Sequence, residues 1–295
     1  MGDASKRDKP MLTNASFRTI LVGLIFVANA ALADDTKSDG LSDKGFSFFV
    51  GLAGSSVRYQ ENTGAIKSKA QTNNLIINSG ALYAIDHDYL LSIENQSTFY
   101  PGNATESWNA TSPFSAGGYS FNTGLLQQDD FSLSQSSTRL FLHKRIANEW
   151  FVMGGPSFNT NSFKRSAFVA AQPGVNTSSV VEETASEILV NLGIGLESEQ
   201  VLNRPDHYSL SLTAGVPVWR RVTNTDNPGD TFTNIQGYDV WLEGRYSWAI
   251  KNNIQIGLWG QLSNSSRGSQ TIGLAELPNS RLETAGYGLE LLWKL

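Results

Sequence analysis

Cysteine is absent from the 295-residue chain, so neither a disulfide nor a lipid attached to cysteine can stabilise or anchor the protein. Charge is also scarce, because Asp, Glu, Lys and Arg together make up only 17% of the sequence. Acidic residues outnumber basic ones and give a formal net charge of -5. A disulfide scaffold, a lipoprotein and a cationic nucleic-acid binder are therefore disfavoured.

Long apolar runs are nearly absent as well. The run from Ile20 to Ala33 is shorter than the roughly 20 residues that a transmembrane helix needs. It follows basic residues such as Lys6 and Arg7 and closes on Ala31-Leu32-Ala33, which is typical of a secretory signal peptide. We expect a signal peptide at residues 1–33, cleaved after Ala33, and then a short periplasmic segment at residues 34–44. Cleavage would change the net charge from -5 to -7, because this segment has four basic and two acidic residues.

The rest of the chain alternates apolar and polar residues with a period of two. In residues 238–250 the even positions, such as Tyr238 and Leu242, are mostly apolar, and most odd positions, such as Asp239 and Glu243, are polar. One face of such a strand suits lipid and the other suits water. This pattern predicts about ten strands near residues 45–60, 73–86, 88–99, 131–146, 149–160, 185–199, 206–220, 237–250, 252–264 and 281–295.

Short and long connections alternate between these segments. The long ones, rich in Asn, Ser, Thr, Gly and Pro, occupy roughly residues 61–72, 100–130, 161–184, 221–236 and 265–280. Aromatic residues cluster near both strand ends, as at two bilayer boundaries. Residues 45–295 are therefore expected to form one all-β, antiparallel up-and-down transmembrane barrel with short periplasmic turns and long extracellular loops. The barrel would have twelve strands instead of about ten if residues 107–128 formed another hairpin. Bulges are expected near Arg139 and Pro156.

The final strand has an apolar face formed by Tyr287, Leu289, Leu291, Trp293 and Leu295. It resembles the terminal strand of Gram-negative outer-membrane β-barrel proteins, which implies location in the outer membrane, contact with its lipid and lipopolysaccharide, and recognition by the barrel-assembly machinery. The last residue departs from the pattern, which has Phe or Trp there. Independently of the resemblance, this strand must pair with residues 46–52 to close the sheet. The residues of this assembly signal are Tyr287, Leu289, Leu291, Trp293 and Leu295.

Strand parity directs a set of charged residues into the lumen. Glu94 and Arg139 lie at similar depths on neighbouring strands, so an ion pair is expected between them. A barrel of about ten strands has an interior that side chains can largely fill. The charged set therefore forms either a polar plug or a narrow, cation-preferring path. The predicted lumen charge network is Glu94, Arg139, His143, Glu187, Asp239, Glu243, Arg245 and Glu290, and Glu197 and Lys294 share its parity.

Three tryptophans on consecutive strands have the same parity. Trp219, Trp241 and Trp259 are expected to point inward, the first two near the external mouth. Such an aromatic rim either binds a sugar or an apolar ligand or simply fills the top of a small barrel.

Catalysis has little support in the sequence. The chain is similar to omptin proteases in size and strand number, but His87, His143 and His207 are all expected near periplasmic strand ends, away from an external active site. The sequence has no G-x-S-x-G motif and predicts no metal or cofactor site.

We therefore expect a narrow pore or a surface ligand-binding barrel with a largely plugged lumen. The alternatives are a rim enzyme acting on lipid, lipopolysaccharide or peptide, and a structural or adhesive barrel. The length is also similar to that of a solitary autotransporter-type barrel.

Overall fold

The structure is a computed structural model that describes residues 45–147, 149–175, 180–198, 206–251, 253–273 and 275–295. The expected signal peptide and periplasmic segment, residues 1–44, lie outside the described residues and remain predictions. Within the described residues no helix has the length and apolarity to cross a membrane.

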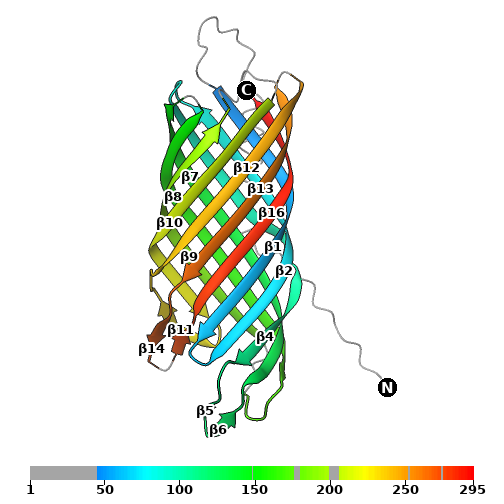
Figure 1. Cartoon of the computed structure of the whole chain (residues 1–295), viewed down its shortest axis with the longest axis vertical. Helices are drawn as coiled ribbons and strands as arrows, with labels where there is room; N and C mark the ends of the chain where they lie inside the picture. The colour runs from blue at the N-terminus through cyan, green and yellow to red at the C-terminus, as the bar shows by residue number, and fades with distance from the viewer. Residues whose placement is uncertain (1–44, 148, 176–179, 199–205, 252, 274) are drawn as a thin grey trace, which may run out of the picture. The chain divides into compact units, whose positions relative to one another are not determined.

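Ten long strands, one of them divided into two segments, form one antiparallel sheet (Figure 1). Short strands accompany them toward one end: β5 (Phe114–Ala116), β6 (Tyr119–Phe121), β11 (Asn227–Phe232), β14 (Gln270–Ile272) and β15 (Ala275–Leu277). The ten long strands are β1 (Gly45–Thr63), β2 (Ile66–Ala84), β3 (Tyr89–Tyr100) with β4 (Asn103–Ala110), β7 (Gly124–Ala147), β8 (Trp150–Ala170), β9 (Val180–Glu197), β10 (Asp206–Asn224), β12 (Gly237–Lys251), β13 (Ile254–Arg267) and β16 (Asn279–Lys294).

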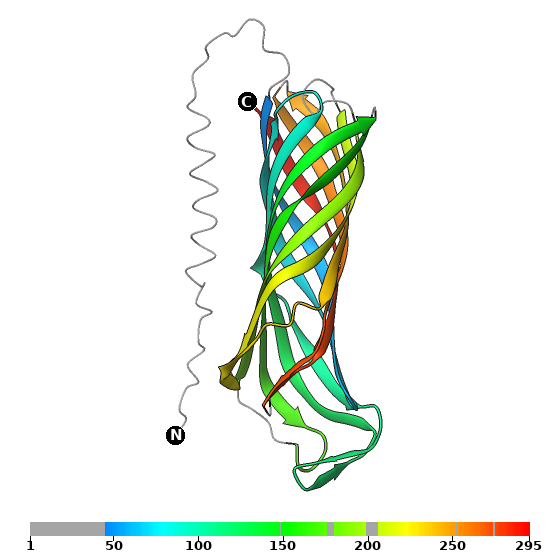
Figure 2. The same ribbon diagram turned by 90° about the vertical axis from the view of Figure 1, so that its left-hand side faces the viewer.

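The first and last strands close the sheet into a barrel. β1 pairs with β2 on one side and with β16 on the other, in a continuous register from Ser47 opposite Lys294 to Asn62 opposite Asn279. The blue and red strands lie side by side in both views (Figures 1 and 2). The predicted pairing of the terminal strand with residues 46–52 is confirmed, and the sheet has no open edge along this seam.

The ring has ten strands and not twelve. β3 and β4 are two segments of one long strand, interrupted at Pro101, because β2 and β7 each pair with both of them. Residues 107–128, which a twelve-stranded barrel would use as an extra hairpin, instead end β4, begin β7 and form the separate small hairpin of β5 and β6.

The strands run further at their extracellular ends than expected. The predicted loop at residues 61–72 is reduced to a tight turn at Gly64 and Ala65, where Gly64 has a positive φ of 52° that glycine adopts without strain. Most of residues 161–184 is likewise strand. Polar composition suggested loops there, but a strand that has left the bilayer also has a polar outer face.

This change of surroundings explains the parity reversal in β7. Leu140 and Leu142 face outward and are 41% and 46% exposed, whereas Phe131 and Leu133 are buried inside the barrel. The pairing of β7 with β8 keeps one register from Asp130 to Arg145, so the bulge expected near Arg139 is not present. The apolar side of the strand switches because the outside changes from lipid to water.

Two regions of the barrel can therefore be distinguished. The apolar belt comprises the outward side chains near the periplasmic ends, including Leu52, Leu75, Leu192, Leu258 and Leu289, each more than half exposed. Beyond it, the extracellular extension comprises the described parts of residues 56–73, 103–138, 160–187, 220–236 and 263–284. Most of its outward side chains are polar, with exceptions such as Val169 and Val180. Its interior holds an apolar cluster that includes Tyr59, Phe131, Leu133, Phe163 and Val222.

A charge placed on the belt tests this division. We expect Leu192→Arg to lower the free energy of unfolding by about 2–4 kcal/mol, because its outward side chain lies within the apolar belt. Thr184→Arg, on the outward face of the same strand but in the extension, is the control and should change it by less than about 0.5 kcal/mol. Urea unfolding in lipid vesicles measures both, and equal effects would contradict the assigned belt.

Candidate functional site

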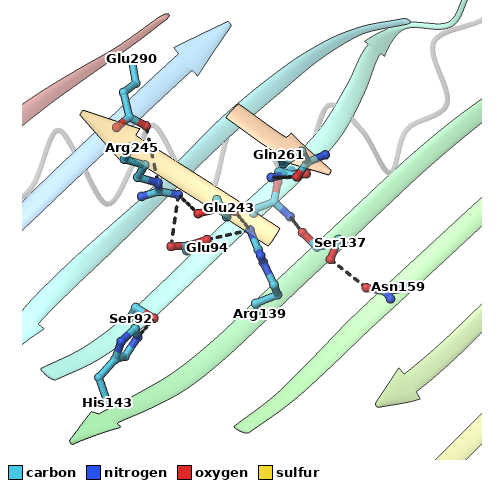
Figure 3. Close-up of polar contacts among 12 residues, drawn as sticks. Ser92, Glu94, Ser137, Arg139, His143, Asn159, Glu243, Arg245, Gln261 and Glu290 are labelled. Carbon is cyan, nitrogen blue, oxygen red and sulfur yellow. Dashed lines mark hydrogen bonds and ion pairs between the residues drawn. The ribbon is translucent and has the colours of Figure 1, made fainter. Parts of the chain in front are cut away.

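A layer of charged side chains crosses the lumen within the apolar belt. Arg139 on β7 places Nη2 2.8 Å from Glu94 Oε2 on β3 and 2.7 Å from Glu243 Oε2 on β12. The structure thus contains the expected Glu94–Arg139 pair. β7 and β12 are separated in the sheet by β8, β9 and β10, so the contact between Arg139 and Glu243 spans the interior (Figure 3).

A second arginine completes this inner layer. Arg245 Nη2 lies 3.2 Å from Glu94 Oε1 and 3.0 Å from Glu243 Oε1, and its Nε lies 4.0 Å from Glu290 Oε2 on β16. All five side chains are at most 13% exposed. Burial of charges is costly unless they are paired, and here two guanidinium groups serve three carboxylates. The inner layer consists of Glu94, Arg139, Glu243, Arg245 and Glu290.

Aromatic rings pack against both arginines. The guanidinium carbon of Arg139 lies 4.7 Å from the ring centroid of Trp241, and that of Arg245 lies 4.2 Å from the ring of Phe49. Phe49 fits over Gly80, where an added Cβ would lie 2.5 Å from its ring. These contacts add cation–π attraction to the ion pairs and fix the planes of the guanidinium groups.

Neutral hydrogen bonds flank the inner layer (Figure 3). Gln96 Nε2 donates to Gln261 Oε1 at 2.9 Å across the lumen, and Ser137 Oγ donates to Asn159 Oδ1 at 2.8 Å. On the periplasmic side, His143 Nε2 lies 2.8 Å from Ser92 Oγ. Two small cavities, of about 50 and 60 Å³, lie on the two sides of the layer. The ion pairs thus divide the interior space.

The other predicted lumen residues lie apart from the inner layer. Asp239 Oδ2 accepts a hydrogen bond from Asn159 Nδ2 at 3.3 Å. Glu187 Oε2 lies 2.8 Å from Nη2 of Arg220, whose Nη1 also donates to the carbonyls of Asn234 and Gln236 at 2.8 Å each. His143 contacts Ser92 and not the carboxylates of the inner layer. The predicted network is therefore several separate groups.

The tryptophan rim is not formed as expected. A shift of register in β10 between Pro217 and Trp219 leaves Val218 and Trp219 both exposed on the outside, so Trp219 does not point into the lumen. The same shift turns Arg220 inward to meet Glu187. Strict alternation predicted neither, because one extra residue reverses every later side chain.

The two remaining tryptophans do point inward, but they lie deep in the barrel. Trp259 is 3% exposed and packs with Ala53 and Ile76. Trp241 lies beside Arg139 and lines the cavity on the extracellular side of the inner layer. Because the strands continue beyond the belt, neither residue forms a ledge at the external mouth.

A second charged layer, in the extracellular extension, was not predicted. Arg165 on β8 places Nε 2.6 Å from Glu106 Oε2 on β4 and Nη2 3.1 Å from Glu61 Oε2 on β1. Arg267 on β13 places Nη1 2.7 Å from Glu183 Oε1 on β9. Each pair joins strands that are not neighbours. This outer layer consists of Glu61, Glu106, Arg165, Glu183 and Arg267, all at most 7% exposed.

The residues of the outer layer fall in segments whose polar composition predicts loops, so the sequence does not predict this layer. A usable signal was present, since alternation continues with the apolar parity exchanged: Phe163 precedes Arg165 and Val181 precedes Glu183, all facing inward. Nearby, Trp108 Nε1 donates to Asp129 Oδ2 at 2.9 Å. Burial, together with the adjacent Glu106 carboxylate, raises the pKa of Asp129 to about 7. Asp129 lies well outside the belt.

All three histidines lie toward the periplasmic end, as expected. His87 is in the turn between β2 and β3, beside Asp88 at 3.0 Å, and His207 Nε2 lies 3.1 Å from Glu197 Oε1 at the start of β10. Among the described residues no three His, Cys, Asp or Glu side chains are grouped so that they could hold a metal ion.

This architecture is that of Gram-negative outer-membrane β-barrel proteins. The outer membrane protease OmpT from Escherichia coli matches with a TM-score of 0.64 and 8% identity, over 88% of this chain and 99% of the OmpT chain. At this identity the likeness shows the fold alone.

Other outer-membrane structures are more distant. The outer membrane protein OprG from Pseudomonas aeruginosa matches with a TM-score of 0.34 and 10% identity, over 86% of this chain and 96% of its own. The translocator domain of autotransporter NalP from Neisseria meningitidis matches with a TM-score of 0.36 and 8% identity, over 95% and 96%. No family model and no curated protein matches the sequence.

The outer layer can be tested by removing its central arginine. Arg165→Ala should lower the free energy of unfolding by about 3–5 kcal/mol, because Glu61 and Glu106 would stay buried without their partner. Arg58→Ala is the control, since its ion pair with Glu283 is exposed and should contribute at most about 1 kcal/mol. Urea unfolding measures both, and a small effect of Arg165→Ala would show that the outer layer does not hold the extension together.

Proposed function

We propose that this protein is a closed outer-membrane barrel that acts through its extracellular surface and not as a channel. The main support for this proposal is that two charged layers cross the lumen, and each layer joins strands on different sides of the barrel. An open path for solutes would have to pass both layers and the apolar cluster in the extension. Of the functions considered from the sequence, a surface ligand-binding barrel with a plugged lumen fits this arrangement best.

The shape of the extension supports a surface role. Its strands continue well past the belt, and their outer faces have polar side chains such as Gln71, Asn73 and Thr160. The β5–β6 hairpin projects from the extracellular end and exposes Tyr119, which is 53% accessible (Figure 2). Packing inside the extension gives a rigid support for these outer faces, which suits recognition of a ligand or partner at the cell surface.

The rim enzyme has weaker support. OmpT is a protease by name, but the fold alone does not carry an activity. The described extracellular end has no histidine, and its buried glutamates Glu61, Glu106 and Glu183 are held by arginines, while Asp129 accepts a hydrogen bond from Trp108.

Single-channel recording distinguishes a closed barrel from a narrow pore. We expect the refolded protein to give no stable conductance steps in a planar bilayer, because Arg139 and Arg245 span the lumen with their carboxylate partners. Arg139→Ala and Glu243→Ala should remain silent as long as the outer layer is intact. Stable wild-type steps whose cation selectivity changes with Glu243→Ala would instead establish the narrow pore and refute the closed barrel.

We also propose that the outward face of β16 is the assembly signal read by the barrel-assembly machinery. Tyr287, Leu289 and Leu291 are 79%, 56% and 41% exposed, so the apolar face is accessible on the strand that closes the barrel. The remaining members of the signal are Trp293 and Leu295.

Substitution within this signal should reduce assembly in cells. Trp293→Ala is expected to lower the amount of folded barrel severalfold, because it removes the terminal aromatic anchor. Trp248→Ala on β12 is the matched control, an exposed aromatic near the same end of the barrel. Heat-modifiable gel mobility of the membrane fraction measures folding, and equal losses in both variants would indicate a general girdle effect.

A further inference from the structure

Positive charge gathers on one outer face of the extracellular extension. On β16, β1 and β2 the outward side chains include Arg58, Lys67, Lys69 and Arg281 against the carboxylate of Glu283. Glu276 of β15 lies beside β1 and accepts a hydrogen bond from Thr63 Oγ1 at 2.6 Å, which leaves a net charge of +2 on this face. On β7, β8 and β9 the outward charges of the extension are Asp130, Lys164 and Glu182, which leaves -1. The chain as a whole is acidic, so this face differs in sign from the average surface.

The strand register places these side chains in two adjacent rows. One row runs across Gln71, Arg58, Glu283 and Asn264, and the next runs across Lys69, Gln60, Arg281 and Ser266. Side chains directly opposite on neighbouring strands lie about 4.5–5.5 Å apart at Cβ. Arg58 and Arg281 therefore flank Glu283 on the outer surface, with Lys69 one strand further on.

Ion pairing leaves both arginines accessible. Arg58 Nη1 lies 3.7 Å from Glu283 Oε2, and Arg281 Nη2 lies 2.9 Å from Glu283 Oε1. The side chains of Arg58 and Arg281 are still 57% and 52% exposed. One carboxylate cannot neutralise two guanidinium groups, so this arrangement can accept a further anion beside Glu283.

The face lies immediately above the apolar belt. The row before Arg58 holds Ser56, Ala285 and Leu262, and the row before that includes Leu75 and Tyr287, which are 53% and 79% exposed. A surface groove is lined by Ser56, Leu262 and Ala285 together with Arg58 and Glu283, and so runs from apolar to charged side chains. An exposed tyrosine at the end of a lipid-facing surface marks the level of the lipid head groups.

From this placement we propose that Arg58 and Arg281, assisted by Lys69, form a binding site for the phosphate groups of an outer-leaflet glycolipid of the lipopolysaccharide type. The acyl part would lie on the apolar belt beside Tyr287, and the phosphates would meet the two guanidinium groups. Arginine is suited to this role because its planar fork binds phosphate through two hydrogen bonds. The site is on the outer surface, so it is independent of whether the lumen conducts.

Binding of lipid A to the refolded full-length barrel in detergent tests the proposal. Native mass spectrometry, titrated with bisphosphorylated lipid A, should show binding to the wild type that weakens about tenfold in the double variant R58A/R281A. E283Q should bind more tightly than the wild type, because it removes the carboxylate that competes with phosphate. The matched controls on the opposite face, K164A and E182Q, alter a similarly exposed ion pair and should leave the affinity unchanged.

Lipid A without phosphates and free inorganic phosphate test whether the site recognises the phosphorylated lipid or an anion alone. Lipid A stripped of both phosphates should bind the wild type and R58A/R281A equally and weakly. Equal affinity of bisphosphorylated lipid A for these two proteins would overturn the proposal, as would undiminished binding of the stripped lipid to the wild type. Complete competition by millimolar inorganic phosphate would also overturn it, because the site would then recognise a free anion. The substituted side chains are exposed, and heat-modifiable gel mobility verifies that each variant is folded.

Discussion

The rest of the structure depends on one constraint, which is that a backbone crossing lipid must satisfy all its polar groups within the protein. The strands achieve this only when the sheet closes, and the long register between β1 and β16 provides that closure. Closure with ten strands leaves a narrow interior, whose inward side chains must fill the space or pair with one another. The charged layers follow from this confinement, because a buried carboxylate without a partner would oppose folding.

The same strands pass through two environments, and the side-chain pattern changes between them. In the belt the outside is apolar and the lumen polar, whereas in the extension the outside is polar and the lumen contains rings such as Tyr59, Phe131 and Phe163. Tyr59 and Phe131 stack with centroids 5.6 Å apart, and Arg165 lies over both rings. The extension thus has the interior of a small water-soluble barrel, built on strands that also cross a membrane.

Arginine has a particular role in holding the layers together. Each of Arg139, Arg245 and Arg165 reaches carboxylates on two different strands, so a single side chain joins parts of the sheet that share no backbone hydrogen bonds. Such pairs contribute less to net stability than their number suggests, since each charge loses its hydration. The ion pairs do constrain the register of the strands, because they form only when the strands are correctly paired.

The sequence determined the features that depend on local periodicity. Alternation and turn composition identified all ten strands of the ring, the closing pair, the inward direction of Glu94, Arg139, Glu243, Arg245 and Glu290, and the positions of the three histidines. A period of two fixes which face a residue takes, and this information is carried by each strand separately. The tertiary structure alone decided which inward residues meet across the lumen, because such contacts depend on the arrangement of strands distant in sequence. It also decided the orientations of Trp219 and Arg220, which one shift of register in β10 reversed, and the existence of the outer layer, because a polar outer face looks alike in a loop and in a strand surrounded by water.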